Sequence, residues 1–111
     1  MKELVEFLAN KNRLFKSFDR VDNKAHKIRK KIDIFDALSL KGAYTLIFVI
    51  TQKSRFLNKD VDTIESLQEL LSQNLGHNFK DVTLFINSPL CSKAKAKMAN
   101  ELQWKVYHDA L

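Results

Sequence analysis

Glycine and proline are scarce in this chain, with only two Gly and one Pro among 111 residues. Their usual combined share is about 12%. Tight hairpin turns depend on these residues, so their scarcity disfavours a sandwich or barrel made of many short strands. No Gly or Pro precedes Gly42, so no helix-breaking residue interrupts the N-terminal third. The composition therefore favours long helices joined by few connections.

Seven apolar residues in the N-terminal third follow the alternating spacing of four and three that is typical of an amphipathic helix. They are Leu14, Phe18, Val21, Ala25, Ile28, Ile32 and Phe35. The spacing predicts one long helix with these residues as an apolar seam. The segment 31–36 also alternates as a strand does, so a second interpretation ends the helix near Lys30 and makes 32–36 an edge strand.

The net charge of +6 is concentrated in the same segment, where nine basic residues between Lys11 and Lys31 face only two aspartates. On a helix, six of them form one stripe beside the seam: Arg13, Lys16, Arg20, Lys24, Lys27 and Lys31. Four aspartates (Asp19, Asp22, Asp33 and Asp36) fall on the other flank. Three interpretations stay open: a solvated helix face, a surface for DNA or RNA phosphates, and a helix that pairs with its own copy or a protein partner.

The rest of the chain alternates between strand and helix patterns. Strands are expected at 43–51, 82–86 and 104–108, and helices from about 60 to 75 and from 89 to 102. Right-handed crossovers between parallel strands then give a small α/β domain of two or three layers, with three strands, or four if 32–36 joins the sheet. We expect one domain, in which a hinge at 39–42 separates a basic helical arm (1–41) from a βαβαβ body (42–111).

Ligands of parallel sheets collect beyond the carboxyl ends of the strands. Basic and hydroxyl side chains follow two of the expected strands there, and they make a candidate anion site: Lys53, Arg55, Ser88, Ser92 and Lys93. Ser88 and Pro89 also predict a helix start whose free N–H groups suit a phosphate or carboxylate. The alternative is that Ser88 only caps the helix and that the bases are solvated.

Cys91 lies in the first turn expected for that helix, where thiolate character is favoured, and His108 ends the next strand. A Cys–His pair acting on a phosphorylated or thiol substrate is one interpretation, and an inert cysteine is the other. The acids Asp60, Asp62, Glu65 and Glu69 share a helix, where a solvated face is favoured over a metal site. No cofactor or metal is therefore expected.

The longest apolar run, 43–50, is far shorter than the roughly 20 residues that span a membrane. A single cysteine and an acidic start fit a cytoplasmic protein with neither disulfides nor a membrane partner. The sequence thus predicts a non-catalytic nucleic-acid-associated binding or adaptor protein. The alternatives are an assembly subunit, homo- or hetero-oligomeric, that uses the helix seam, and a small enzyme at the helix start after the second strand.

Overall fold

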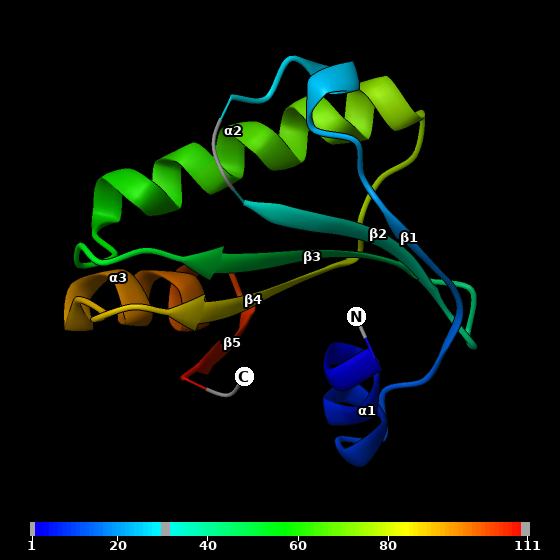
Figure 1. Cartoon of the computed structure of the whole chain (residues 1–111), viewed down its shortest axis with the longest axis horizontal. Helices are drawn as coiled ribbons and strands as arrows, with labels where there is room; N and C mark the ends of the chain where they lie inside the picture. The colour runs from blue at the N-terminus through cyan, green and yellow to red at the C-terminus, as the bar shows by residue number, and fades with distance from the viewer. Residues whose placement is uncertain (1, 30–31, 110–111) are drawn as a thin grey trace.

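The computed structural model describes residues 2–29 and 32–109. Its elements in chain order are α1 (Lys2–Asn10), β1 (Phe15–Arg20), η1 (Lys24–His26), β2 (Asp33–Ser39), β3 (Tyr44–Thr51), α2 (Asn58–Leu75), β4 (Asp81–Asn87), α3 (Ser92–Ala96), η2 (Lys97–Glu101) and β5 (Lys105–His108) (Figure 1). The five strands form one sheet in the order of the chain. The pairs β1–β2 and β2–β3 are antiparallel, and β3–β4 and β4–β5 are parallel, so the sheet is mixed.

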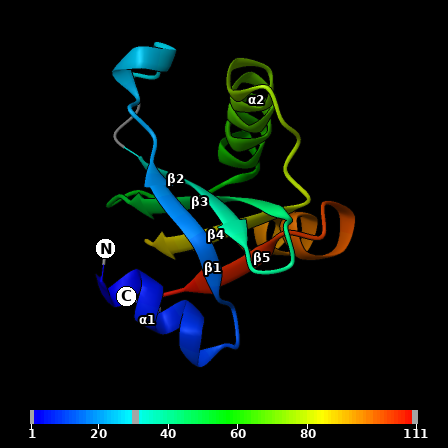
Figure 2. The same cartoon turned by 90° about the vertical axis from the view of Figure 1, so that its right-hand side faces the viewer.

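Helices cover both faces of this sheet. α2 and α3 lie on one face, and the short α1 lies on the other (Figure 2). The two crossovers leave α2 and α3 on the same side because β3, β4 and β5 follow one another in one direction. Each face has its own core: Phe48 and Met98 belong to the α2 side, and Leu8 and Phe85 belong to the α1 side. β3 alternates between the two cores and is buried on both faces, as its continuous apolar run predicts.

The expected strands at 43–51, 82–86 and 104–108 are confirmed as β3, β4 and β5, and the expected helix at 60–75 as α2. The helix α2 begins at Asn58, two residues before the expected start at about 60. Leu57 occupies the N-cap position, and its N–H donates to the Asp60 carboxylate at 2.8 Å. Asp60 therefore stabilises the helix from its third position, reaching back to the chain that precedes it. At the other end Gly76 adopts a left-handed C-cap conformation and ends the helix.

The predicted long N-terminal helix is wrong. The described residues of that segment form β1, the 3₁₀ turn η1 and β2, while the longest helix in the described part of the chain is the 18-residue α2. The sheet accordingly has five strands in mixed orientation, and the three or four mainly parallel strands of the prediction are wrong too. The interpretation of 32–36 as a strand is confirmed, but its expected position at an edge is wrong. β2 pairs with β1 on one side and β3 on the other, and β1 and β5 form the edges of the sheet among the described residues.

A β-bulge explains part of the misleading spacing. The register of β1 against β2 shifts between Phe15 and Ser17, so Phe15 and Phe18 pack into the same core despite a separation of three residues. The other seam members divide between the cores: Val21 and Ile28 belong to the α2 side and Phe35 to the α1 side. The seam therefore does not exist as one surface, and the assembly role built on it falls with it.

The expected hinge at 39–42 is instead the turn of the β2–β3 hairpin. Ser39 and Ala43 are joined by backbone N–H donation at 2.9 Å, and the Ala43 N–H donates to the Ser39 hydroxyl. Gly42 has φ +83°, a conformation that L side chains rarely adopt. The hairpin connects 1–41 to the same sheet as the rest of the chain, so those residues are not a separate helical arm.

Within the described part of the chain, no helix is long and apolar enough to cross a membrane.

Candidate nucleic-acid interface

Five of the six basic residues of the predicted stripe are described by the structure, and they are dispersed along the first edge of the sheet. Arg13 precedes β1, Lys16 and Arg20 lie on it, and Lys24 and Lys27 lie in and directly after η1. Lys31 lies outside the described residues. At about 3.4 Å per residue the six residues of β1 span about 20 Å, which places Arg13 and Lys24 at opposite ends of the strand.

Two of these cations are already paired. The Arg13 guanidinium contacts the Asp81 carboxylate at 2.6 Å, and the side chain is only 13% exposed. Arg20 pairs with Asp33, but there both side chains are more than half exposed. Arg13 therefore stabilises the fold and is poorly placed to meet a large polyanion, whereas Arg20 is accessible but shares its charge with a neighbour.

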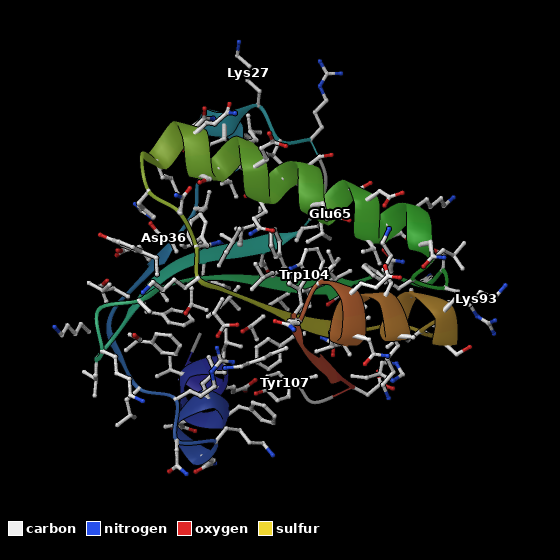
Figure 3. All side chains as sticks on the ribbon, turned by 180° about the vertical axis from the view of Figure 1, so that it is seen from behind. Lys27, Asp36, Glu65, Lys93, Trp104 and Tyr107 are labelled. Carbon is white, nitrogen blue, oxygen red and sulfur yellow. The ribbon has the colours of Figure 1, made fainter. Side chains whose placement is uncertain are left out.

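The cations that remain exposed gather on β1 and on the chain that follows it. Lys16, Lys24, Lys27 and Arg29 are all exposed and form no ion pair with any described residue; we call these four the basic edge. Lys27 projects into solvent beyond α2 (Figure 3). Arg29 is not among the six residues of the predicted stripe, but it belongs to this exposed group.

The position of the basic edge is fixed by ordinary local contacts. Val21 donates its N–H to the Ile34 carbonyl at 2.8 Å, which ends the β1–β2 ladder. Asn23 then donates to the Ile32 carbonyl, and Lys27 takes a left-handed conformation that closes η1. Ile28, 8% exposed, anchors the segment in the core on the α2 side. Lys24, Lys27 and Arg29 lie close to Ile28 in the sequence, and all three are exposed.

Asp19 and Asp22 lie in the same segment and are exposed, so they reduce the local positive charge. Asp22 accepts the backbone N–H of Lys24 at 3.1 Å, which is a turn contact and not an ion pair. The net charge of residues 16–29 stays positive, because five basic residues oppose two acids.

The candidate anion site is only partly brought together. Lys53 and Ser88 line one open cleft of about 520 Å³ at the carboxyl ends of β3, β4 and β5, together with His108 and Asp109. Arg55 and Lys93 lie close enough to Cys91 to act on its charge, and Ser92 begins α3. Anion binding there stays a prediction.

The expected helix start at Ser88 is wrong. Ser88 is buried, and its hydroxyl donates to the Pro89 carbonyl, so it does not cap a helix. Phe56 donates its N–H to Pro89 and accepts one from Cys91, and these bonds hold the chain extended through Leu90. The helix therefore begins at Ser92 with Cys91 as its N-cap, and it ends in a π-helical turn at Glu101.

Backbone hydrogen bonds from Ala94 and Lys93 lower the pKa of the Cys91 thiol, with smaller help from the charges of Arg55 and Lys93; burial opposes them. The described contacts of His108 lie elsewhere: its Nε2 is 2.6 Å from the Ser88 carbonyl oxygen and 3.4 Å from the Asp109 carboxylate. Because a carbonyl oxygen only accepts, Nε2 carries the hydrogen. Among the described residues no hydrogen bond joins His108 to Cys91.

The acidic side chains near the start of α2 form ion pairs that stabilise the fold. Lys97 lies 2.9 Å from Asp62 and 3.8 Å from Glu65, so the helix is tied to η2. The hydrogen bond that Lys97 donates to Asp62 raises the pKa of Lys97, and desolvation opposes this effect. No group of three or more metal-ligating side chains occurs among residues 2–29 and 32–109.

Sequence reasoning missed the cluster in which Asp81 contacts both Arg13 and Lys105, the latter at 3.3 Å. Arg13 and Asp81 are separated by 68 positions, and no local pattern links them. It also missed the ring of His77, which stacks on Tyr44 at 3.7 Å and contacts Asp36 at 3.3 Å. These contacts tie the loop after α2 to β2 and β3.

No protein-family model and no curated protein matches this chain. Solved structures do share its fold. EndoMS in its apo form aligns with a TM-score of 0.57 and 14% identity, over 96% of this chain and 44% of that one. EndoMS in a complex with dsDNA aligns with a TM-score of 0.51 and 15% identity, over 96% and 43%. The chain thus spans less than half the length of these neighbours, and the likeness establishes the fold.

Proposed function

We propose that this chain associates with double-stranded DNA and that the basic edge holds the phosphate backbone. The observation that carries the proposal is the set of four exposed cations without ion pairs, Lys16, Lys24, Lys27 and Arg29, gathered on one border of the sheet. The shared fold supports it, since one structural neighbour is a complex of EndoMS with dsDNA. RNA is the competing polyanion, and a direct comparison decides between them.

The dimensions of the basic edge suit a duplex. The strand β1, which carries Lys16, is about 20 Å long, and Lys24 lies beyond its far end. Phosphates recur about every 3.4 Å of helix axis along one strand, so this length faces about six base steps. Lysine and arginine contacts to phosphate position a protein and carry no base information. We therefore expect binding with little sequence preference, which is the behaviour of a binding or adaptor module.

The salt dependence of binding gives the first test. Four phosphate contacts predict a slope of about −3.6 for log affinity against log salt concentration, from about −0.9 per contact. The measurement is fluorescence anisotropy of a labelled duplex between 50 and 200 mM salt. An equal-length RNA duplex is titrated in parallel, and tighter binding to the RNA would overturn the choice of DNA.

The variant test reverses three charges of the basic edge: Lys24→Glu, Lys27→Glu and Arg29→Glu. We expect the slope to fall by about 2.7 and binding to be lost at 150 mM salt. The matched control reverses three exposed lysines elsewhere, Lys59→Glu, Lys80→Glu and Lys95→Glu, for the same change in net charge. Equal loss in both triple variants would mean that only net charge matters, and the proposed interface would be wrong.

A further inference from the structure

A cavity of about 320 Å³ opens at the end of the sheet opposite the basic edge's η1 turn. The β2–β3 turn and the chain entering β1 lie together at this end (Figure 1). The residues that matter for its chemistry are Arg13, Lys41, Lys105, Asp81, Leu14 and Leu40. Its volume falls in the lower part of the range found for small-molecule sites.

The charges in this cavity are unbalanced, because three cations share one carboxylate. Asp81 accepts from the Arg13 Nη2 at 2.6 Å and contacts the Lys105 Nζ through the same oxygen at 3.3 Å. Lys41 is exposed and pairs with no acid among the described residues. The Arg13 Nη1 is buried and has no hydrogen-bond partner among them either. The Nη1 group of Arg13 therefore has N–H donors left to hold a second carboxylate.

Apolar side chains stand beside these cations. Leu14 and Leu40 are 54% and 53% exposed, so two apolar side chains face water at the rim of this cavity. The Leu40 N–H donates to the Leu14 carbonyl at 3.3 Å, so the backbones that carry the two side chains are held together. The Phe15 ring lies 6.0 Å from the Arg13 guanidinium carbon and adds a further apolar wall.

We propose that this cavity binds a monocarboxylate that carries an apolar chain. The carboxylate is held by Arg13 with Lys41 and Lys105, and the chain covers Leu14 and Leu40. Nucleic-acid phosphate suits the cavity poorly, because hydrophilic backbone would leave the two leucines in water. Two kinds of ligand carry a carboxylate next to an apolar chain: a free organic acid, and the C-terminus of a peptide that ends in an apolar residue.

The test is a titration of the full chain, labelled with ¹⁵N, with hexanoate. Such a ligand has about eight non-hydrogen atoms, so millimolar affinity is expected. We expect saturable shifts of the amide signals of Leu14, Leu40 and Lys41. Hexanol lacks the charge and inorganic phosphate lacks the chain, so each binds at least about tenfold more weakly. Equal shifts with hexanol, or no saturation with hexanoate by about 10 mM, would overturn the proposal.

Two exposed variants locate the site without disturbing the fold. Lys41→Gln and Leu40→Asn each weaken hexanoate binding by about threefold or more, whereas Lys80→Gln, an exposed lysine at the same end outside the cavity, leaves it unchanged. A peptide ending in Ala-Leu and its C-terminal amide then separate the two sources: tighter binding of the peptide acid than of hexanoate assigns a peptide terminus. If the amide binds as well as the acid, or Lys80→Gln weakens binding as Lys41→Gln does, the proposal is wrong.

Discussion

The ion pair between Arg13 and Asp81 joins the start of β1 to the start of β4, across the width of the sheet. Asp81→Asn keeps the shape of the side chain and removes its charge, which leaves the Arg13 guanidinium without a counterion at 13% exposure. Breaking a fully buried pair in this way costs about 3–5 kcal/mol. Asp81 is 20% exposed and its second partner, Lys105, is half exposed, so solvent compensates in part. We expect the free energy of unfolding to fall by about 2–3 kcal/mol.

The assay is urea unfolding followed by far-ultraviolet circular dichroism and by the fluorescence of the buried Trp104. The midpoint should fall while the slope with denaturant stays constant, because the surface exposed on unfolding is unchanged. Asp33→Asn is the matched control. It removes the same kind of charge from the exposed Arg20 pair, where we expect less than about 1 kcal/mol.

A second variant excludes a trivial loss of packing. Arg13→Met combined with Asp81→Asn removes both charges, so the double variant should be more stable than Asp81→Asn alone. If Asp81→Asn costs no more than Asp33→Asn, the Arg13 pair is solvated and the reasoning from burial fails. If the double variant is less stable than either single variant, the two residues do not act as a charge pair.

Three further predictions concern α1, the hairpin turn and the thiol. Leu8→Ala should lower the free energy of unfolding by about 2–5 kcal/mol in the same urea assay, because Leu8 is fully buried against the sheet; a loss below about 1 kcal/mol would mean that α1 is not docked. Gly42→Val should cost about 1–2 kcal/mol, since φ is +83° there, and an unchanged midpoint would refute that strain. The hydrogen bonds from Ala94 and Lys93 lower the pKa of Cys91, so its alkylation by iodoacetamide should reach half-maximal rate at a lower pH than a free cysteine. Thiolate then predominates above that lower pH, and a midpoint at or above the ordinary value would contradict the backbone contribution.

The elements with both a clear period and clear ends could be predicted from the sequence. β3 is one continuous run of β-branched and aromatic residues, and α2 has an acid in its first turn and Gly76 after its last residue. The strands β4 and β5 could also be predicted from their apolar residues. β3 and β4 are buried on both faces and α2 has clear ends, and sequence patterns describe both kinds of signal well.

The N-terminal third could not be predicted in this way because its pairing is non-local. Its apolar residues follow a helical spacing, yet β1 and β2 gain more by extending a sheet that already contains β3. The bulge between Phe15 and Ser17 hides the strand period of β1. The sequence suggests a hinge after Ser39 because the apolar residues before it follow a helical spacing, although this turn in fact joins two paired strands. The predicted helix start at Ser88 is wrong for a similar reason. Phe56, which precedes Pro89 by 33 positions, holds residues 89–91 extended through backbone hydrogen bonds.

The basic edge also answers a structural need, and the two roles make different demands on the side chains. β1 is an edge strand, and charged residues on such a strand prevent pairing with a second copy. Either sign of charge satisfies that need, whereas phosphate binding requires positive charge. Lys16→Glu should therefore weaken DNA binding without increasing self-association in sedimentation, while Lys16→Val should weaken DNA binding to a smaller extent and promote self-association. If Lys16→Glu binds DNA as the unaltered chain does, Lys16 protects the edge only, and the interface reduces to Lys24, Lys27 and Arg29 around the η1 turn.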